Sequence, residues 1–404
     1  MEEKKSIVPV HDFATKLLQP SLIPRLKEYV RWQTGLEKIP DRVPISINLD
    51  LTTGCNFACA HCVDLKILNQ PIKFKHEELL NSLDLMYRKG LKSVILIGGG
   101  EPTLYSKFGE VIYFLKERDI DIAVVTNGTG MEKIDNMGHL FTKNDWVRLS
   151  LDSGTDKTFQ TMHKPKMQIT LEQICHDAYN VKQNHPGLTL GFSFIVTWKG
   201  AYANDEDIVE NIDEIVPSAK LARKHKFDYF SIKPFLERSP ENNAEMINIS
   251  YRQSLEEYQQ TIKRVRESIE EVKKLETPYF KIRESANLIA LENGTIENYK
   301  NQPGNCHMTF FHGVLSPLGM FICPVYRAVD QASIGDKNAY STEENHQQTK
   351  KNVTNVIKNF NASHECRNVT CLYNSANWLI EDLIKNPEKI DSLSPSKEAH
   401  DYFF

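Results

Sequence analysis

The sequence predicts an α/β fold in which a partial (β/α)6 barrel of the TIM type is followed by a smaller domain. Short runs rich in Val, Ile and Phe alternate with longer stretches of helical periodicity between Ile45 and about Leu275. Consecutive βα units imply a parallel sheet with right-handed crossovers. The six units are fewer than a closed eight-stranded barrel needs, so we expect an open barrel.

Each expected strand is bounded by Gly, Asn, Asp or Pro. The clearest helix follows the sixth strand, where apolar residues between Leu255 and Val272 recur at spacings of three and four, and this stripe should pack on the sheet. The expected strands are Ile45–Leu51, Ser93–Ile97, Ile122–Thr126, Trp146–Leu151, Thr189–Val196 and Phe227–Ile232, and the expected helices include Glu77–Arg88, Phe108–Arg118 and Leu171–Val181.

The chain divides into three expected parts. Residues 1–44 should form a helical N-terminal extension broken by prolines, and residues 45–275 the barrel. Residues 276–404 lose the βα rhythm and contain four late cysteines, which indicates a separate metal-stapled domain with a C-terminal helix. Loops at the carboxyl ends of parallel strands are where such folds place their chemistry.

Composition and charge exclude several classes of protein. The 404 residues carry 49 Lys and Arg against 53 Asp and Glu, and 40% are hydrophobic, as in a soluble globular protein. No apolar run is long enough to span a bilayer, and the near-neutral charge gives no footprint for nucleic acid. The start of the sequence has no secretory signal, so we expect a cytoplasmic protein with neither membrane nor nucleic acid as partner.

The eight cysteines form an early triplet, a single Cys175 and a late quartet. In a cytoplasmic chain, metal-binding or catalytic thiols are a better interpretation than disulfides. Cys55, Cys59 and Cys62 directly follow the first expected strand as C-x3-C-x2-C. Zinc sites usually take four ligands, whereas three thiolates suit an iron–sulfur cube that leaves one iron without a protein ligand.

The triplet resembles the signature of the radical S-adenosylmethionine (SAM) superfamily. Four further segments agree with that family, each at the end of an expected strand, and the resemblance covers about residues 45–235. It implies an enzyme whose 4Fe–4S cluster binds SAM and cleaves it to a 5′-deoxyadenosyl radical, with a flavodoxin- or ferredoxin-type reductant. The four segments are Gly99-Gly100-Glu101-Pro102, Thr126-Asn127-Gly128, Ser150-Leu151-Asp152 and Ser231-Ile232-Lys233-Pro234.

The resemblance also implies roles for individual residues. The early cysteines would ligate the cluster, and Glu101 with the Gly99–Gly100 backbone would hold the methionine ammonium. Alternatively, Glu101 could cap a helix that begins at Pro102, and Asp152 could cap the turn at Ser153-Gly154. No acid, base or hydrogen donor is identified. Further expected cofactor contacts are Asn127, Ser150, Asp152 and His61, the last in a place where the family often has an aromatic side chain near adenine.

The late quartet, Cys306, Cys323, Cys366 and Cys371, resembles the auxiliary-cluster regions called SPASM and twitch. Four thiolates can enclose one complete 4Fe–4S cluster, which favours the twitch type. They would also suit a structural zinc. His307 and His364 are possible substitute ligands, and a short hairpin is expected before Cys323 with Gly319 at its turn.

The favoured function is oxidation of a small hydroxylated or aminated metabolite, such as a sugar or aminocyclitol, with the auxiliary cluster accepting an electron. The alternatives are a peptide-modifying maturase that crosslinks or epimerises, a redox-neutral epimerase or carbon–carbon bond-forming enzyme, and a zinc-stapled scaffold. Cys175 is either a buried helix residue or a hydrogen-atom donor. Expected substrate contacts are Asn127, Trp198, Lys199, Lys233, Glu237 and Arg238, and Pro234–Ser250 is an expected lid.

Overall fold

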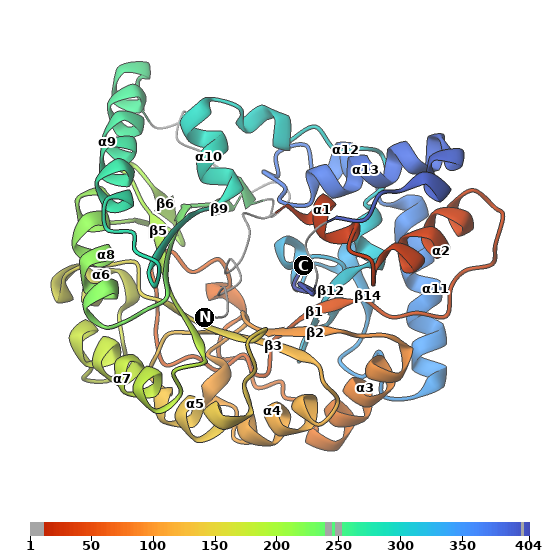
Figure 1. Ribbon diagram of the computed structural model, residues 1–404, viewed down its shortest axis with the longest axis horizontal. Coiled ribbons are helices and arrows are strands. Elements are labelled where there is room, and N and C mark those ends of the chain that lie inside the picture. The colour runs from red at the N-terminus through yellow and green to blue at the C-terminus, as the bar shows by residue number, and fades with distance from the viewer. Residues whose placement is uncertain (1–11, 239–244, 247–252, 397–399) are drawn as a thin grey trace.

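The computed structural model describes residues 12–238, 245–246, 253–396 and 400–404. A ten-stranded sheet forms its centre, in the order β11-β8-β5-β4-β3-β2-β1-β12-β13-β14. The sheet curves, and its helices lie on the outer side (Figure 1). The prediction of an α/β fold with a partial barrel is confirmed.

The six expected strands are all present and pair in parallel in chain order. Their apolar runs predicted them well, because each strand is covered by helices on one face and needs a continuous apolar layer there. They are β1 (Ser46–Leu49), β2 (Ser93–Leu96), β3 (Asp121–Thr126), β4 (Trp146–Ser150), β5 (Thr189–Val196) and β8 (Tyr229–Pro234).

The sheet continues beyond these six strands. The strand β11 (Lys281–Glu284) pairs in parallel with β8, and β12 (His312–Ser316) pairs in parallel with β1. Two short antiparallel strands, β13 (Gly319–Phe321) and β14 (Ser333–Gly335), follow β12, and Gly319 lies beside the expected hairpin turn. Strands from residues 276–404 therefore extend the barrel sheet at both edges, while a domain boundary at residue 275 stays a prediction.

The helices cover the outer face. The stripe on α9 is buried at Ile262, Val265, Ile269 and Val272, but it packs mainly against α8, which corrects the expectation that it lies on the sheet. The helices are α1 (Phe13–Leu17), α2 (Ile23–Gln33), α3 (His76–Lys89), α4 (Phe108–Lys116), α5 (Met131–Met137), α6 (Asp156–His163), α7 (Leu171–Asn184), α8 (Ile215–Lys224), α9 (Leu255–Lys273), α10 (Ala286–Asn293), α11 (Glu343–Asn359), α12 (Ala362–Glu365) and α13 (Asn374–Lys385). The hairpins β6 (Tyr202–Ala203) with β7 (Glu206–Asp207) and β9 (Glu237–Arg238) with β10 (Glu245–Met246) complete the described strands.

The two faces of the sheet have different chemistry because side chains alternate along a strand. Outward residues such as Leu49, Val124 and Phe192 are fully buried in the main apolar core with the helices. Inward residues form a separate small cluster at the amino-terminal end of the barrel, where Trp146 of β4 meets Phe403.

Residues 400–404 fill that end of the barrel. The Phe403 ring lies 5.5 Å from the Trp146 ring. Ser93 donates its hydroxyl to the Tyr402 carbonyl (2.7 Å), and the Phe404 N–H donates to Ser46 Oγ (3.3 Å). These partners begin β4, β2 and β1, so the segment closes the barrel at the end opposite to the expected site.

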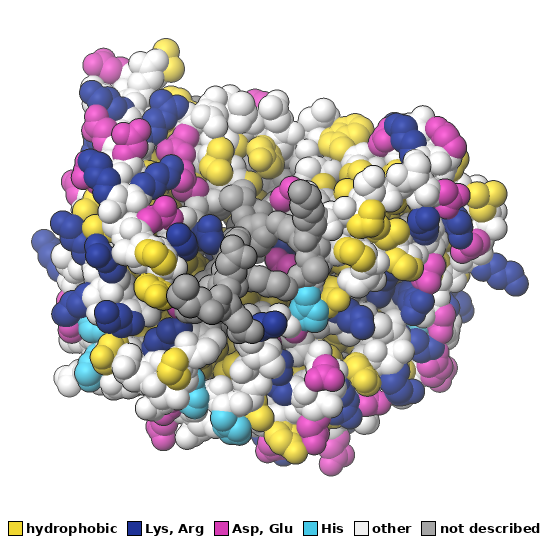
Figure 2. All heavy atoms as spheres, viewed as in Figure 1, with side chains coloured by type: hydrophobic (Ala, Val, Ile, Leu, Met, Phe, Trp, Pro, Cys, Tyr) yellow, Lys and Arg dark blue, Asp and Glu magenta, His cyan; other side chains and the backbone are white. Residues whose placement is uncertain are grey.

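Lys, Arg, Asp and Glu side chains are intermixed over the face seen in Figure 2. No helix in the described ranges combines the length and apolar character that a membrane crossing requires.

We expect Phe403→Ala to lower the free energy of unfolding by about 3 kcal/mol, because it leaves a cavity against Trp146. Urea denaturation measures the loss. Tyr279→Ala, at a side chain that is 74% exposed, is the control and should change stability by no more than about 0.5 kcal/mol. Equal effects of the two substitutions would contradict the conclusion that residues 400–404 close the barrel.

Candidate active site

The three early cysteines lie in the loop that leaves the carboxyl end of β1. This loop is held against the end of α6, where the Ala60 N–H donates to the Met162 carbonyl (2.9 Å). The Cys62 N–H donates to the Cys59 carbonyl (3.1 Å) and closes a turn between them. Cys55, Cys59 and Cys62 are thereby kept on one compact loop.

The three thiols interact electrostatically. Burial raises the pKa of Cys59 well above its usual range, and the neighbouring thiolates of Cys62 and Cys55 raise it further. All eight cysteines lie in the described part of the chain, and none is in a disulfide. Three half-buried thiols that repel one another as thiolates fit a group that supplies positive charge, such as an iron–sulfur cluster.

His163 at the end of α6 touches this set and was not singled out from the sequence. Its Nδ1 lies 3.3 Å from Cys59 Sγ, and its Nε2 lies 2.9 Å from the Leu151 carbonyl oxygen. A carbonyl only accepts, so Nε2 carries the hydrogen and Nδ1 accepts from the thiol. Burial lowers the pKa of His163 to about 4, which keeps the ring neutral.

Glu101 lies at the carboxyl end of β2 and is 2% exposed. Its Oε1 accepts from Thr103 N (3.0 Å), Thr103 Oγ1 (2.6 Å) and Thr126 Oγ1 (2.7 Å), and its Oε2 accepts from the Asn127 N–H (2.7 Å). Burial raises the pKa of Glu101 although these donors oppose the shift. A carboxylate oxygen has two lone pairs, so Oε2 retains room for a further donor. Glu101 also caps the short turn Pro102–Leu104, as the alternative interpretation expects.

Neighbouring atoms come so close to the backbone before Glu101 that both positions there require glycine. A Cβ on Gly99, whose φ is +62°, would lie 2.8 Å from the Asp50 carboxylate. A Cβ on Gly100 would lie 2.5 Å from the Gly54 carbonyl of the cysteine loop. Only glycine therefore allows this backbone to pass so near the loop.

Asp152 lies fully buried beyond the end of β4. Its Oδ2 is 3.0 Å from His61 Nε2, and its Oδ1 accepts from the Ile195 N–H (2.7 Å). Burial opposes ionisation, but these contacts outweigh it and lower the pKa of Asp152. The turn-cap alternative is wrong, because the Gly154 N–H donates instead to Glu214 (2.7 Å).

The remaining expected cofactor contacts lie around the same strand ends. Asn127 donates its side-chain amide to Asn56 Oδ1 in the cysteine loop (2.8 Å). Ser150 is half-buried on the inner face at the end of β4. His61 stands perpendicular to His163, with 5.2 Å between the ring centroids. The structure thus brings the early cysteines and the expected SAM contacts to one end of the barrel.

The four late cysteines converge although they are distant in sequence. Burial raises the pKa of Cys371 well above its usual range, and the thiolates of Cys323, Cys306 and Cys366 add to the shift. Four thiols that interact electrostatically fit either an auxiliary 4Fe–4S cluster or a zinc ion.

His307 and His364, the possible substitute ligands of this quartet, contact other side chains instead. His307 is held by the Tyr29 hydroxyl at Nδ1 and by Glu381 at Nε2, both at 2.9 Å. His364 contacts Glu365 (3.1 Å) and its side chain is 68% exposed.

Arg327 links the two cysteine sets and was also missed. It follows Cys323 by four positions, and its guanidinium reaches Asp50 (2.8 Å) and Asp64 (2.7 Å), the latter two positions after Cys62. Burial raises the pKa of Asp50 to about 7, and the Arg327 charge opposes that shift. All three side chains are buried, so one buried ion-pair network joins the loop of the late quartet to the early loop.

The other expected residues lie elsewhere or outside the described residues. Cys175 is buried in the outer core on α7, away from the inner face. Trp198 packs against Phe235, and Lys199 is an exposed partner of Glu257. The side chain of Arg238 and most of the expected lid Pro234–Ser250 lie outside the described residues.

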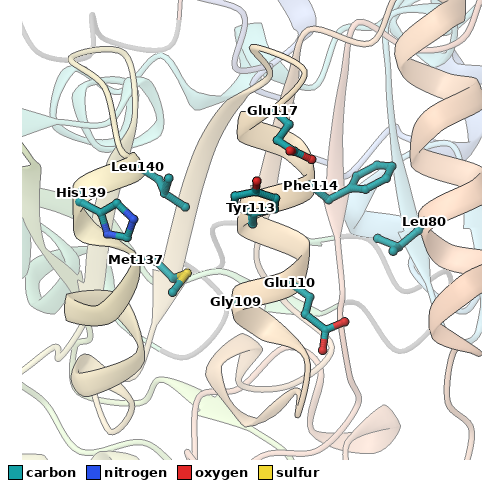
Figure 3. A pocket seen from close by; sticks show the side chains of 9 residues that line it. All are labelled: Leu80, Gly109, Glu110, Tyr113, Phe114, Glu117, Met137, His139 and Leu140. Carbon is teal, nitrogen blue, oxygen red and sulfur yellow. The ribbon is translucent and has the colours of Figure 1, made fainter.

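A groove of about 580 Å³ lies on the outer surface between α4 and the segment after α5 (Figure 3). Tyr113, Phe114, Met137 and Leu140 line it. None of the expected site residues borders it, so the groove is separate from the strand ends.

Residues 49–215 match the family described as the Radical SAM superfamily. The chain is 24% identical over 172 residues to an S-adenosylmethionine-dependent nucleotide dehydratase of Selenomonas ruminantium, covering 40% of this chain and 59% of that protein. It is 30% identical over 106 residues to the mycofactocin maturase MftC of Mycolicibacterium smegmatis, covering 26% of this chain and 25% of that protein. The matched parts span less than two thirds of these curated relatives.

Among solved structures, the fold is similar to Streptococcus suis SuiB bound to the precursor peptide SuiA. The TM-score is 0.54 at 16% identity, covering 79% of this chain and 67% of that chain. This likeness extends well beyond residues 49–215 and concerns the fold.

We expect Arg327→Met to lower the free energy of unfolding by about 3–5 kcal/mol, because it leaves two carboxylates buried without their cation. Thermal or urea unfolding measures the effect. Lys164→Met is the control, since its ion pair with Glu206 is about 40% exposed and should contribute at most about 1 kcal/mol.

Adding Asp50→Asn and Asp64→Asn to Arg327→Met should recover part of the loss, because the uncompensated charges disappear. A loss that these additions leave unchanged would assign Arg327 a packing role instead.

Proposed function

We propose that this chain, whose residues 49–215 form a radical SAM domain, binds a 4Fe–4S cluster and S-adenosylmethionine through its early cysteines and the Glu101 segment. The observation that carries the proposal is the group of three half-buried thiols next to buried Glu101 and two obligatory glycines. These residues lie at the carboxyl ends of neighbouring parallel strands, where barrel folds bind ligands.

Cys55, Cys59 and Cys62 would hold the cluster as thiolates, which leaves one iron for the cofactor. The His163 ring lies beside this loop, with its Nδ1 3.3 Å from Cys59 Sγ. When bound, the cluster and the cofactor together supply an electron and then a 5′-deoxyadenosyl radical that takes a hydrogen atom from the substrate.

Glu101 would bind the ammonium group of the cofactor. Thr103, Thr126 and Asn127 fix the carboxylate and leave acceptor capacity on Oε2. Gly99 and Gly100 let the backbone run close to Asp50 and to the Gly54 carbonyl, so Glu101 lies beside the cysteine loop. Asn127, Ser150, Asp152 and His61 complete the proposed cofactor site.

Cys306, Cys323, Cys366 and Cys371 would hold one auxiliary 4Fe–4S cluster. Such a group supplies an acceptor for the second electron when a hydroxyl- or amine-bearing carbon is oxidised to a carbonyl or imine. The Arg327 network supports a fixed separation between the two cysteine sets.

We propose that the substrate is a small hydroxylated or aminated metabolite that this site oxidises. Four late thiols suffice for one auxiliary cluster, which supports this class. A peptide substrate is the second candidate, supported by the mycofactocin maturase relative and by the fold shared with peptide-bound SuiB. In D2O, oxidation predicts a product that has lost a hydrogen pair, whereas epimerisation predicts unchanged composition with solvent deuterium gained.

We expect anaerobically reconstituted protein to bind about eight irons per chain, and Cys59→Ala and Cys323→Ala about four each. Cys59→Ala should abolish 5′-deoxyadenosine formation, because the cofactor-binding cluster is lost. Cys323→Ala should retain some cleavage of SAM but lose oxidised product. Iron analysis and chromatography of the nucleoside measure these outcomes.

Cys175→Ala is the matched control, since Cys175 lies in the outer core and should not change the iron content. Full iron content in Cys59→Ala would contradict the ligand assignment. Zinc instead of iron in the late site would contradict the auxiliary cluster.

We expect Glu101→Gln to weaken SAM binding about 10- to 100-fold, because a charged hydrogen bond contributes about 1.5–3 kcal/mol. Equilibrium dialysis under anaerobic conditions measures the affinity. Glu110→Gln, at an exposed carboxylate, should leave it unchanged. A loss of thermal stability with unchanged affinity would favour the capping role alone.

A further inference from the structure

Three basic side chains face the interior of the barrel. Arg148 on β4 lies 5.1 Å from the Trp146 ring, which belongs to the inner cluster with Phe403, so Arg148 is on the inner face. Lys233 on β8 and Arg283 on β11 share that face, as the sheet register establishes.

The register puts the three residues on one face of the sheet, at different heights along their strands. Arg148 and Tyr229 lie on either side of the same β5 residue, Gly191, with which both pair. Tyr229 in turn pairs with Lys281 of β11. Lys233 is four positions after Tyr229, and Arg283 is two positions after Lys281, so all point the same way. Tyr229 interacts electrostatically with both arginines, which places its phenol among them.

Arg148 and Lys233 make no ion pair with a carboxylate in the part of the chain that the structure describes, whereas Arg283 interacts electrostatically with Glu276. The Nε atoms of Arg148 and Arg283 are buried without a hydrogen-bond partner, and Lys233 makes no ion pair with a described carboxylate. Burial lowers the pKa of Lys233 well below its usual range, the Arg148 charge adds to this, and Asp152 opposes it. Asp152 is already held by His61 and by the Ile195 N–H.

Elsewhere the protein pairs its buried lysines. Lys116 lies 2.7 Å from Asp145, Lys182 lies 2.7 Å from Asp228, and Lys16 contacts Asp401 at 2.9 Å. An uncompensated buried cation costs free energy. Arg148 and Lys233 are therefore exceptions that a bound anion would compensate.

The inner cations are not fully enclosed. Burial shifts the pKa values of Arg148, Lys233 and Arg283 downward, yet each residue is only half-buried. Phe403 lies at the amino-terminal end of the barrel, whereas Lys233 lies at the carboxyl end of β8, the end that holds the proposed cofactor site.

We propose that Arg148, Lys233 and Arg283 bind a phosphoryl group of the substrate inside the barrel. This inference rests on the proposed function and narrows its substrate to a phosphorylated metabolite. Three cations and a phenol match a dianion with several acceptor oxygens better than a single carboxylate. The phosphate would anchor one end of the substrate among these side chains, with the carbon to be oxidised beside the proposed cofactor site.

The test uses the anaerobically reconstituted full chain, with inorganic pyrophosphate and malonate as probes in titration calorimetry. We expect pyrophosphate to bind, and Arg148→Gln, Lys233→Met and Arg283→Gln each to weaken it tenfold or more. Lys263→Met, at an exposed side chain on α9, should bind pyrophosphate with the affinity of the parent protein. Tighter binding of malonate, or equal binding by all variants, would overturn the proposal.

Thermal unfolding without any probe separates a binding role from a structural one. Lys233→Met should unfold at the same or a higher temperature than the parent, because it removes an uncompensated charge, and pyrophosphate should no longer stabilise it. Lys182→Met is the matched contrast and should unfold at a lower temperature, since Asp228 loses its cation. A comparable drop for Lys233→Met would overturn the binding role.

Affinity for SAM distinguishes this inference from the proposed function. The three inner variants should bind SAM as the parent does, and a parallel loss would assign these cations to the cofactor carboxylate and overturn the proposal. If the parent binds no iron and no SAM, the proposed function fails, whereas loss of pyrophosphate binding alone leaves it standing.

Discussion

The alternation of side chains across a curved parallel sheet is the constraint on which this protein depends. One face of every strand must join the apolar layer under the helices, so residues such as Leu49, Val124 and Phe192 are fixed as core. The other face is released from that demand and holds Arg148, Ser193 and Lys233. The division separates stability, carried by the outer layer, from ligand chemistry, carried by the interior and the strand ends.

The strand ends concentrate groups that would be costly alone. Asp152, Glu101 and the Arg327 network are buried there beside the half-buried thiols, and each of these charged groups is compensated by a contact across the site rather than by solvent. Such mutual compensation is typical of a site built for a charged group. It also explains why distant segments, from the early loop and from the late quartet, meet at one place.

The sequence predicted the features that depend on residues close together in the chain. The apolar runs predicted all six barrel strands, because burial under helices demands them. The strand at Lys281–Glu284 was missed, since its alternate residues Lys281 and Arg283 face the interior and break the apolar run. The motifs placed the early cysteines and Glu101 together, but nothing local indicates that His163 reaches Cys59 or that Arg327 spans Asp50 and Asp64.

The closing segment at residues 400–404 has a consequence for biosynthesis. The hydrogen bond from Phe404 to Ser46 joins positions 358 residues apart, so β1 leaves the ribosome long before its partner exists. Contacts of such sequence separation form late and slowly. Until residues 400–404 have been synthesised, the amino-terminal end of the barrel is therefore open to water. The barrel is completed only after that segment binds.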